Sequence, residues 1–207
     1  MLTNHLVLLE LFCGTKSVGK VFEEKGYKVI SLDNRKKTDP TYCVDILEWD
    51  GYKNIEVPDF IWASPPCTTF SIASGGRHRT VKNMEGFTED AKIGIKILQK
   101  TIEIIRYFEE KNPKLKWAFE NPRGLMRHTE EVKDILRSTC CYCKYDHCYK
   151  KPTDIFSNFP LELLMCREKR GEKTCHHLRG NKGIHSAKLN DKFKIPSKLI
   201  EYILEQI

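Results

Sequence analysis

The stretch LVLLELFCGTKSVGKVFEEKGYKVISLD, Leu6–Asp33, decides the fold. LVLLELF is a continuous apolar run, which is typical of a strand that is buried on both faces of a parallel sheet. SVGKVFEEKG follows, with helical spacing of Val18, Val21 and Phe22 and a closing glycine of the kind that caps helices. YKVISLD is a second strand, so the stretch predicts two parallel strands joined by a right-handed crossover.

The alternation of strands and helices continues along the chain. We expect a short strand at 43–46, longer strands at 59–64 and 115–120, and helices at 89–110, 129–137 and 197–207. The helix at 129–137 is predicted because TEEVKDILR opens with a capping box. Beyond Cys140 the pattern loosens. The sequence therefore predicts an α/β fold with an open, mostly parallel sheet and a small irregular C-terminal segment.

Length and composition indicate one globular domain. The 207 residues can bury a core, and 40% hydrophobic and 30% charged residues are ordinary proportions. Residues 1–139 form the expected core. Residues 140–207 hold 13 Lys and Arg against 8 Asp and Glu, which favours either a nucleic-acid contact or a merely solvated basic surface. No apolar run approaches the roughly 20 residues of a membrane span, and no signal peptide is recognisable, so we expect an intracellular protein without a membrane contact.

Three polar features follow the predicted strands at their carboxyl ends, where open α/β sheets bind ligands. Gly14 permits a tight turn and close approach of the backbone to a ligand. Asp33 ends the second strand, where an acidic side chain can accept hydrogen bonds from ribose hydroxyls. Asp45 could accept from an exocyclic amine. Together they point to a nucleoside-containing cofactor, although the Gly14 turn alone is equally typical of a plain strand–helix connection.

Two further strand ends carry reactive groups. In FIWASPPCTTFS, Pro65 and Pro66 fix two successive φ angles, so the turn presents Cys67 in few alternative orientations. A thiol held in this way is a candidate nucleophile if its surroundings favour the thiolate. WAFENPRG ends a buried strand in Glu120, which could serve as a general acid. A buried cysteine beside a structural turn remains the alternative for Cys67.

These segments resemble the DNA cytosine-5 methyltransferases, which use S-adenosylmethionine. ELFCGTKSVGKVFEEKGYKVISLDN is similar to the family's cofactor loop, DFIWASPPCTTFS to its Pro-Cys nucleophile motif, and WAFENPRG to its Glu-Asn motif. The later KKPTDIFSN and CHHLRG segments resemble those of the short phage and large-DNA-virus members. The resemblance implies a Rossmann-like methyltransferase sheet. The cofactor residues that it implies, together with the strand-end groups above, are Phe12, Gly14, Ser17, Asp33, Asp45 and Pro65.

The resemblance also implies a mechanism. Cys67 would add to carbon 6 of cytosine while Glu120 protonates or hydrogen-bonds ring nitrogen 3, which makes carbon 5 able to accept a methyl group. A base inside duplex DNA cannot be reached, so the cytosine would be flipped out. We expect a monomer that acts in the cytoplasm or nucleus of a host cell.

Basic residues outside these motifs are candidate DNA contacts. The long connection Ser71–Phe87 is a candidate lid, and Arg77 and Arg79 within it could grip phosphates. The family's Gln-x-Arg-x-Arg segment is absent, and Arg123, Lys150 or Lys151 could supply the missing cation. The late Gly-Asn-Ser segment is not recognisable, and only 87 residues follow Glu120, too few for the large target-recognition region of most members.

The nine cysteines, an odd number without a signal peptide, argue against a disulfide framework. Cys143, Cys166, Cys175 and His176 would make a Cys3His set of the type that structural zinc favours. Rival ligands are Cys140, Cys141, Cys148, His147 and His177. The spacings match no standard zinc finger, so unmetallated structural thiols are the competing interpretation.

Three other functions compete with cytosine-5 methylation of DNA. An amino-methyltransferase also uses Ser-Pro-Pro, but there an aromatic residue normally follows, whereas here Cys67 does. A cytosine methyltransferase acting on RNA would use the same chemistry. A non-catalytic nucleic-acid-binding module would bind the cofactor without transferring the methyl group.

Overall fold

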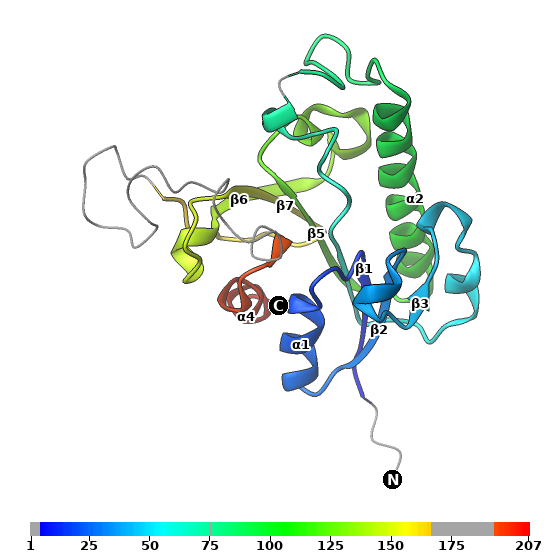
Figure 1. Ribbon diagram of the computed structural model, residues 1–207. Coiled ribbons are helices and arrows are strands. Elements are labelled where there is room, and N and C mark those ends of the chain that lie inside the picture. The colour runs from blue at the N-terminus through cyan, green and yellow to red at the C-terminus, as the bar shows by residue number, and fades with distance from the viewer. Residues whose placement is uncertain (1–4, 75, 167–192) are drawn as a thin grey trace.

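The computed structural model describes residues 5–74, 76–166 and 193–207. Within them the chain forms a seven-stranded sheet in the order β3-β2-β1-β4-β5-β7-β6 (Figure 1). The strands are β1 (Val7–Leu11), β2 (Lys28–Asp33), β3 (Tyr42–Cys43), β4 (Phe60–Ala63), β5 (Lys116–Pro122), β6 (Leu136–Cys141) and β7 (Pro152–Ser157). The first five are parallel, whereas β7 is antiparallel to β5 and to β6.

Helices cover both faces of this sheet. α1 (Ser17–Glu24) and α4 (Ser197–Leu204) pack on one face, and α2 (Glu89–Lys111) packs on the other (Figure 1). Alternate residues of β1 serve the two cores: Val7, Leu9 and Leu11 pack with the residues of α2, and Leu8 packs with those of α1 and α4. This double burial explains why the first strand is a continuous apolar run rather than an alternating one.

The strand order determines where a ligand crevice forms. The chain runs from β1 outward to β2 and β3, then returns to β4 on the other side of β1. The connections after β1 and β4 therefore diverge, and such a switch point leaves a crevice at the carboxyl ends of the strands. Short 3-10 segments shape the connections: Lys36–Thr38, Ile46–Glu48, Gly51–Asn54, Ile72–Ser74, Met126–His128, Glu130–Val132 and Tyr142–Tyr145.

Two sequence predictions for the C-terminal half differ from the structure. The helix expected at 129–137 is wrong: only Glu130–Val132 forms a 3-10 turn, and β6 begins at Leu136. The Thr129 hydroxyl, expected to cap that helix, is buried without a hydrogen-bond partner in the described residues. Beyond Cys140 the chain is also more regular than expected, since β7 joins the sheet between β5 and β6.

The expected final helix is confirmed. α4 begins at Ser197 directly after Pro196 and buries Leu199, Ile200 and Ile203 against the sheet. Because α4 lies beside α1 (Figure 1), the last helix supports the helix that follows the loop after β1.

Candidate active site

A cavity lies at the carboxyl ends of β1, β2, β4 and β5. The residues predicted from sequence that line it are Phe12, Gly14, Ser17, Asp33, Asp45, Pro65, Cys67, Glu120 and Lys151. The fold thus brings into one cavity side chains that are more than 100 residues apart in the chain. The predicted site at this edge of the sheet is one continuous space.

The loop after β1 has the tight geometry expected from its glycine. Gly14 has a φ of 50° and Phe12 a φ of 63°, in the left-handed region that glycine adopts at little cost. The Gly14 N–H donates a 2.9 Å hydrogen bond to Asp33 Oδ2. This bond fixes the end of β2 against the loop that leaves β1.

The Arg35 guanidinium binds the Asp33 carboxylate, which was expected to bind a ribose. Its Nε donates to Asp33 Oδ1 at 2.9 Å and its Nη2 to Oδ2 at 3.1 Å. Burial acts to raise the pKa of Asp33, but the hydrogen bonds from Arg35 and Gly14 outweigh it and lower that pKa below its usual value. Asp33 is therefore ionised at neutral pH, and its role in binding a ribose stays a prediction.

The C-terminal segment closes the cavity on another side. Phe193 and Ile195 line it, and the Ile195 N–H donates a 3.1 Å hydrogen bond to the buried Ser17 hydroxyl. Sequence reasoning missed this contribution because the two residues are separated by 178 positions. It supplies a wall of the cavity that no local sequence pattern indicated.

Hydrogen bonds to backbone carbonyls hold the Pro-Pro turn at both ends. Asn121 donates from Nδ2 to the Pro65 carbonyl at 3.0 Å. The Cys67 carbonyl accepts from the N–H groups of Phe70 and Ser71 at 3.0 and 2.8 Å. The side chain after Glu120 therefore locks the turn that carries Cys67, which joins the two reactive segments structurally.

Cys67 is partly buried, and its surroundings do not favour the thiolate in the ligand-free protein. Burial raises the pKa of the Cys67 thiol, the Glu120 carboxylate raises it further, and Lys151 opposes both. Of the three cations considered for the missing Gln-x-Arg-x-Arg segment, Lys151 is the one that lines the cavity. Its position just before β7 was not deducible from the sequence, because the pattern there did not indicate a strand.

Arg79 was expected to contact DNA, and the structure corrects this prediction. Its side chain has 0% exposure. The guanidinium donates to the carbonyl oxygens of Thr69, Met84 and Ala91 at 2.9, 2.7 and 2.6 Å, and it lies 4.1 Å from the Phe70 ring centroid. With its donors used inside the protein, Arg79 fixes the connection Ser71–Phe87 to the start of α2 and cannot reach a phosphate.

Two other predicted DNA contacts remain accessible. Arg77, in the same connection, is exposed, and so is Arg123 beyond β5. The Arg123 N–H donates to the Pro152 carbonyl at 2.9 Å, so its side chain leaves the sheet next to β7. Their role in DNA binding stays a prediction.

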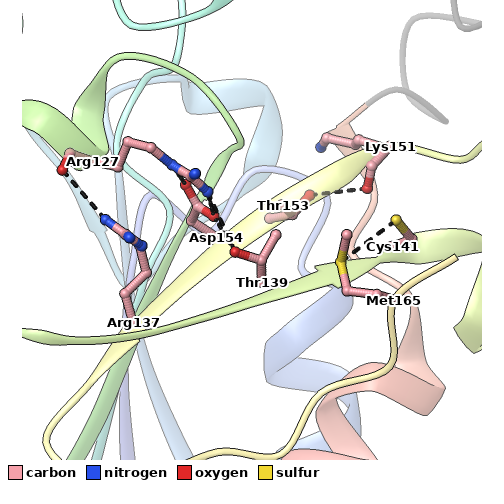
Figure 2. Close-up of polar contacts among 8 residues, drawn as sticks. All are labelled: Arg127, Arg137, Thr139, Cys141, Lys151, Thr153, Asp154 and Met165. Carbon is pink, nitrogen blue, oxygen red and sulfur yellow. Dashed lines mark hydrogen bonds and ion pairs between the residues drawn. The ribbon is translucent and has the colours of Figure 1, made fainter. Parts of the chain in front are cut away.

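A buried ion pair anchors β7 beside the site. Arg127 donates from Nε to Asp154 Oδ2 and from Nη2 to Asp154 Oδ1. The Thr139 hydroxyl donates to Asp154 Oδ1 at 2.8 Å (Figure 2). Asp154 is 2% exposed. Asp154 of the KPTD segment thus has a structural partner, which holds β7 and, just before it, Lys151 in place.

The predicted zinc ligands are only partly within the described residues. Cys143 and Cys166 are buried and form an apolar cluster with Cys141, while Cys175 and His176 lie outside the described residues. Among residues 5–74, 76–166 and 193–207, no group of His, Cys, Asp and Glu could hold a metal ion.

Across the same ranges no helix has the length and apolar character to cross a bilayer.

Glu10 is a cavity residue that sequence reasoning missed. It lies in β1 among apolar residues, is 2% exposed, and its Oε2 has no hydrogen-bond partner in the described part of the chain. Burial raises the pKa of Glu10 to about 8. The signal in the sequence was a single carboxylate inside the run LVLLELF.

The sheet order and the strand-end cavity define a Rossmann-like methyltransferase. A family model described as C-5 cytosine-specific DNA methylase matches residues 6–150, and the chain belongs to that family. It is 32% identical to the probable DNA (cytosine-5)-methyltransferase of frog virus 3 (isolate Goorha), over 84% of this chain and 79% of that one. The family implies S-adenosylmethionine as the methyl donor.

One solved structure supports the fold. The S. pombe Dnmt2 methyltransferase superposes with a TM-score of 0.52 at 11% identity, covering 77% of this chain and 52% of that one. The Entamoeba histolytica methyltransferase EhMeth gives a TM-score of 0.49 at 13% identity, covering 81% and 58%. The chain thus spans little more than half the length of these solved structures.

Proposed function

We propose that this protein methylates carbon 5 of cytosine in DNA through a covalent bond between Cys67 and the base. The observation that carries the proposal is that Cys67 and Glu120, from the ends of the neighbouring strands β4 and β5, line the same cavity as the cofactor-loop residues. The printed name of the frog virus 3 relative supports DNA as the substrate.

The cavity residues fit S-adenosylmethionine. Val44, Ile46 and Ile97 offer apolar contact for an adenine ring, and Asp33 offers a carboxylate for hydroxyl groups. Glu10 adds a buried oxygen without a partner in the described residues. When bound, the cofactor supplies an electrophilic methyl group.

The chain's own groups prepare the base. The Cys67 thiol passes its proton to water, and the thiolate adds to carbon 6 while Glu120 donates a proton or hydrogen bond to ring nitrogen 3. The electron pair of the carbon 5–carbon 6 bond becomes available at carbon 5, which takes the methyl group. Water then takes the proton from carbon 5, and Glu120 recovers any proton that it gave to ring nitrogen 3. This restores the carbon 5–carbon 6 double bond and expels the Cys67 thiolate.

The position of Cys67 requires the base to leave the duplex. Because the thiol lies within a cavity behind the Pro-Pro turn, a stacked cytosine cannot approach it, and the nucleotide must rotate out. Arg77 and Lys82 are exposed on the connection that follows the turn in the chain, and they can bind the phosphates that flank the extruded nucleotide.

The test is incubation with labelled S-adenosylmethionine and duplex DNA, single-stranded DNA or tRNA, followed by nucleoside analysis. The proposal predicts 5-methyldeoxycytidine from duplex DNA. Label in an N-methylated nucleoside would instead support an amino-methyltransferase, and label confined to tRNA would support action on RNA. Cofactor binding without any labelled nucleoside would indicate a non-catalytic binding module.

A further inference from the structure

The Glu120 carboxylate has a buried hydrogen-bond partner that the sequence did not indicate. Tyr142 follows β6 directly and begins the 3-10 segment Tyr142–Tyr145. Its hydroxyl lies 3.2 Å from Glu120 Oε2, and the contact is buried. Tyr142 is 0% exposed, and Glu120 is 7% exposed where it lines the cavity. The pair therefore lies at the wall between the cavity and the core.

The direction of this hydrogen bond follows from burial. Burial and the nearby Glu120 and Cys140 raise the pKa of Tyr142 well above 10, so its hydroxyl keeps its proton at any physiological pH. Towards a carboxylate it therefore donates. Within the described residues Glu120 Oε1 receives no hydrogen bond, so the tyrosine holds one oxygen and leaves the other for a substrate atom.

Tyr142 is itself fixed in place. Its N–H donates to the Lys151 carbonyl at 3.2 Å, and Lys151 Nζ lies 4.8 Å from the centroid of its ring. The ring belongs to the same core cluster as Ala118, which lies two residues before Glu120 on the same face of β5. A donor held this rigidly defines the orientation of the carboxylate that it contacts.

We propose that Tyr142 is a positioning residue for the methyl transfer, acting through Glu120. The inference rests on the proposed function, since it assigns Glu120 the contact with ring nitrogen 3. The charged or titratable groups that act on this pair are Cys67, Cys140 and Lys151. Tyr142 orients Glu120 among them so that its second oxygen faces the base.

The test compares Tyr142→Phe with Tyr145→Phe. Tyr145 is a matched control because it lies in the same 3-10 segment, is 3% exposed, and has its hydroxyl engaged with the Leu164 N–H at 2.9 Å, away from Glu120. For Tyr142→Phe we expect kcat for methyl transfer to fall about 10-fold, the effect of one buried hydrogen bond to a charged group. The KM for cofactor should not change.

A double-mutant cycle separates positioning from a general effect on folding. In a Glu120→Gln background, Tyr142→Phe should lower kcat no further, because the residue through which it acts is already changed. Equal losses in both backgrounds, or an equal loss in Tyr145→Phe, would overturn the positioning role. So would an unchanged kcat in Tyr142→Phe alone. Absence of 5-methylcytosine with the wild-type protein would overturn the proposed function and this inference together.

Discussion

Glu10 makes the stability of this protein fall as pH rises, and Glu10→Gln isolates the effect. Burial raises the pKa of Glu10 from 4.5 to about 8 in the folded protein. Below 4.5 the carboxyl is protonated in both states, and the folded state has no disadvantage. Between 4.5 and 8 the unfolded chain ionises while the folded chain does not, so the free energy of unfolding decreases with each unit of pH.

The magnitude follows from the size of the shift. One pKa unit corresponds to about 1.4 kcal/mol, so the full shift corresponds to a loss on the order of 5 kcal/mol, of which about 3 kcal/mol falls between pH 5 and pH 8. Glutamine has nearly the same shape and no charge to lose. The difference in unfolding free energy between wild type and Glu10→Gln should therefore change by about 3 kcal/mol across this range in favour of the variant.

Urea denaturation at pH 5, 6.5 and 8 measures this difference, and the other titrating groups cancel because both proteins contain them. Glu24→Gln is the matched control, since Glu24 is an exposed carboxylate on α1; its difference from wild type should stay flat. A Glu10→Gln difference that is also independent of pH would refute the assignment of a protonated, buried Glu10.

Four other substitutions test the site. Asp33→Ala should weaken S-adenosylmethionine binding by about 1–3 kcal/mol through lost charged hydrogen bonds; unchanged affinity in calorimetry would place the ribose elsewhere. Arg77→Ala should reduce the slope of log affinity for DNA against log salt by about 0.9, whereas Arg79→Ala should lower the melting temperature and leave that slope unchanged. Alkylation of Cys67, followed by mass spectrometry, should accelerate with pH beyond 9, the ordinary value from which its pKa is raised. Lys151→Ala should slow it at fixed pH, and an equal or faster rate would show that this cation does not favour the thiolate.

The first half of the chain could be predicted because its local patterns agree with its environment. Buried parallel strands require continuous apolar runs, and the turns that follow them require Gly, Pro or Asp. The sequence therefore predicts the elements β1, α1, β2, β4 and β5. Once the strands are parallel and adjacent, Cys67 and Glu120 must reach the same edge of the sheet. Their meeting in one cavity therefore followed from the sequence.

The remainder depends on long-range contacts that no local pattern reports. β6 (LRSTCC) and β7 (PTDIFS) mix polar and apolar residues without a regular alternation. Their polar groups are satisfied by distant residues, as in the pair of Asp154 with Arg127. An arginine in a glycine-bearing loop is expected at the surface. Arg79 is buried instead, because its guanidinium donates to three backbone carbonyls. The contact of Tyr142 with Glu120 likewise depends on the sheet order, in which β7 lies between β5 and β6.

The central claim is that Cys67 forms a bond to the base, and a mechanism-based trap tests it most directly. Duplex DNA containing 5-fluorocytosine should give a cofactor-dependent adduct that survives denaturing electrophoresis, because fluorine cannot leave carbon 5 as a proton does. Mass spectrometry should locate the adduct on the peptide that contains Cys67. Cys67→Ala should give none, whereas Cys43→Ala, which removes an exposed thiol, should be trapped like wild type. Formation of 5-methylcytosine by Cys67→Ala at a rate comparable to wild type would contradict covalent catalysis by this residue.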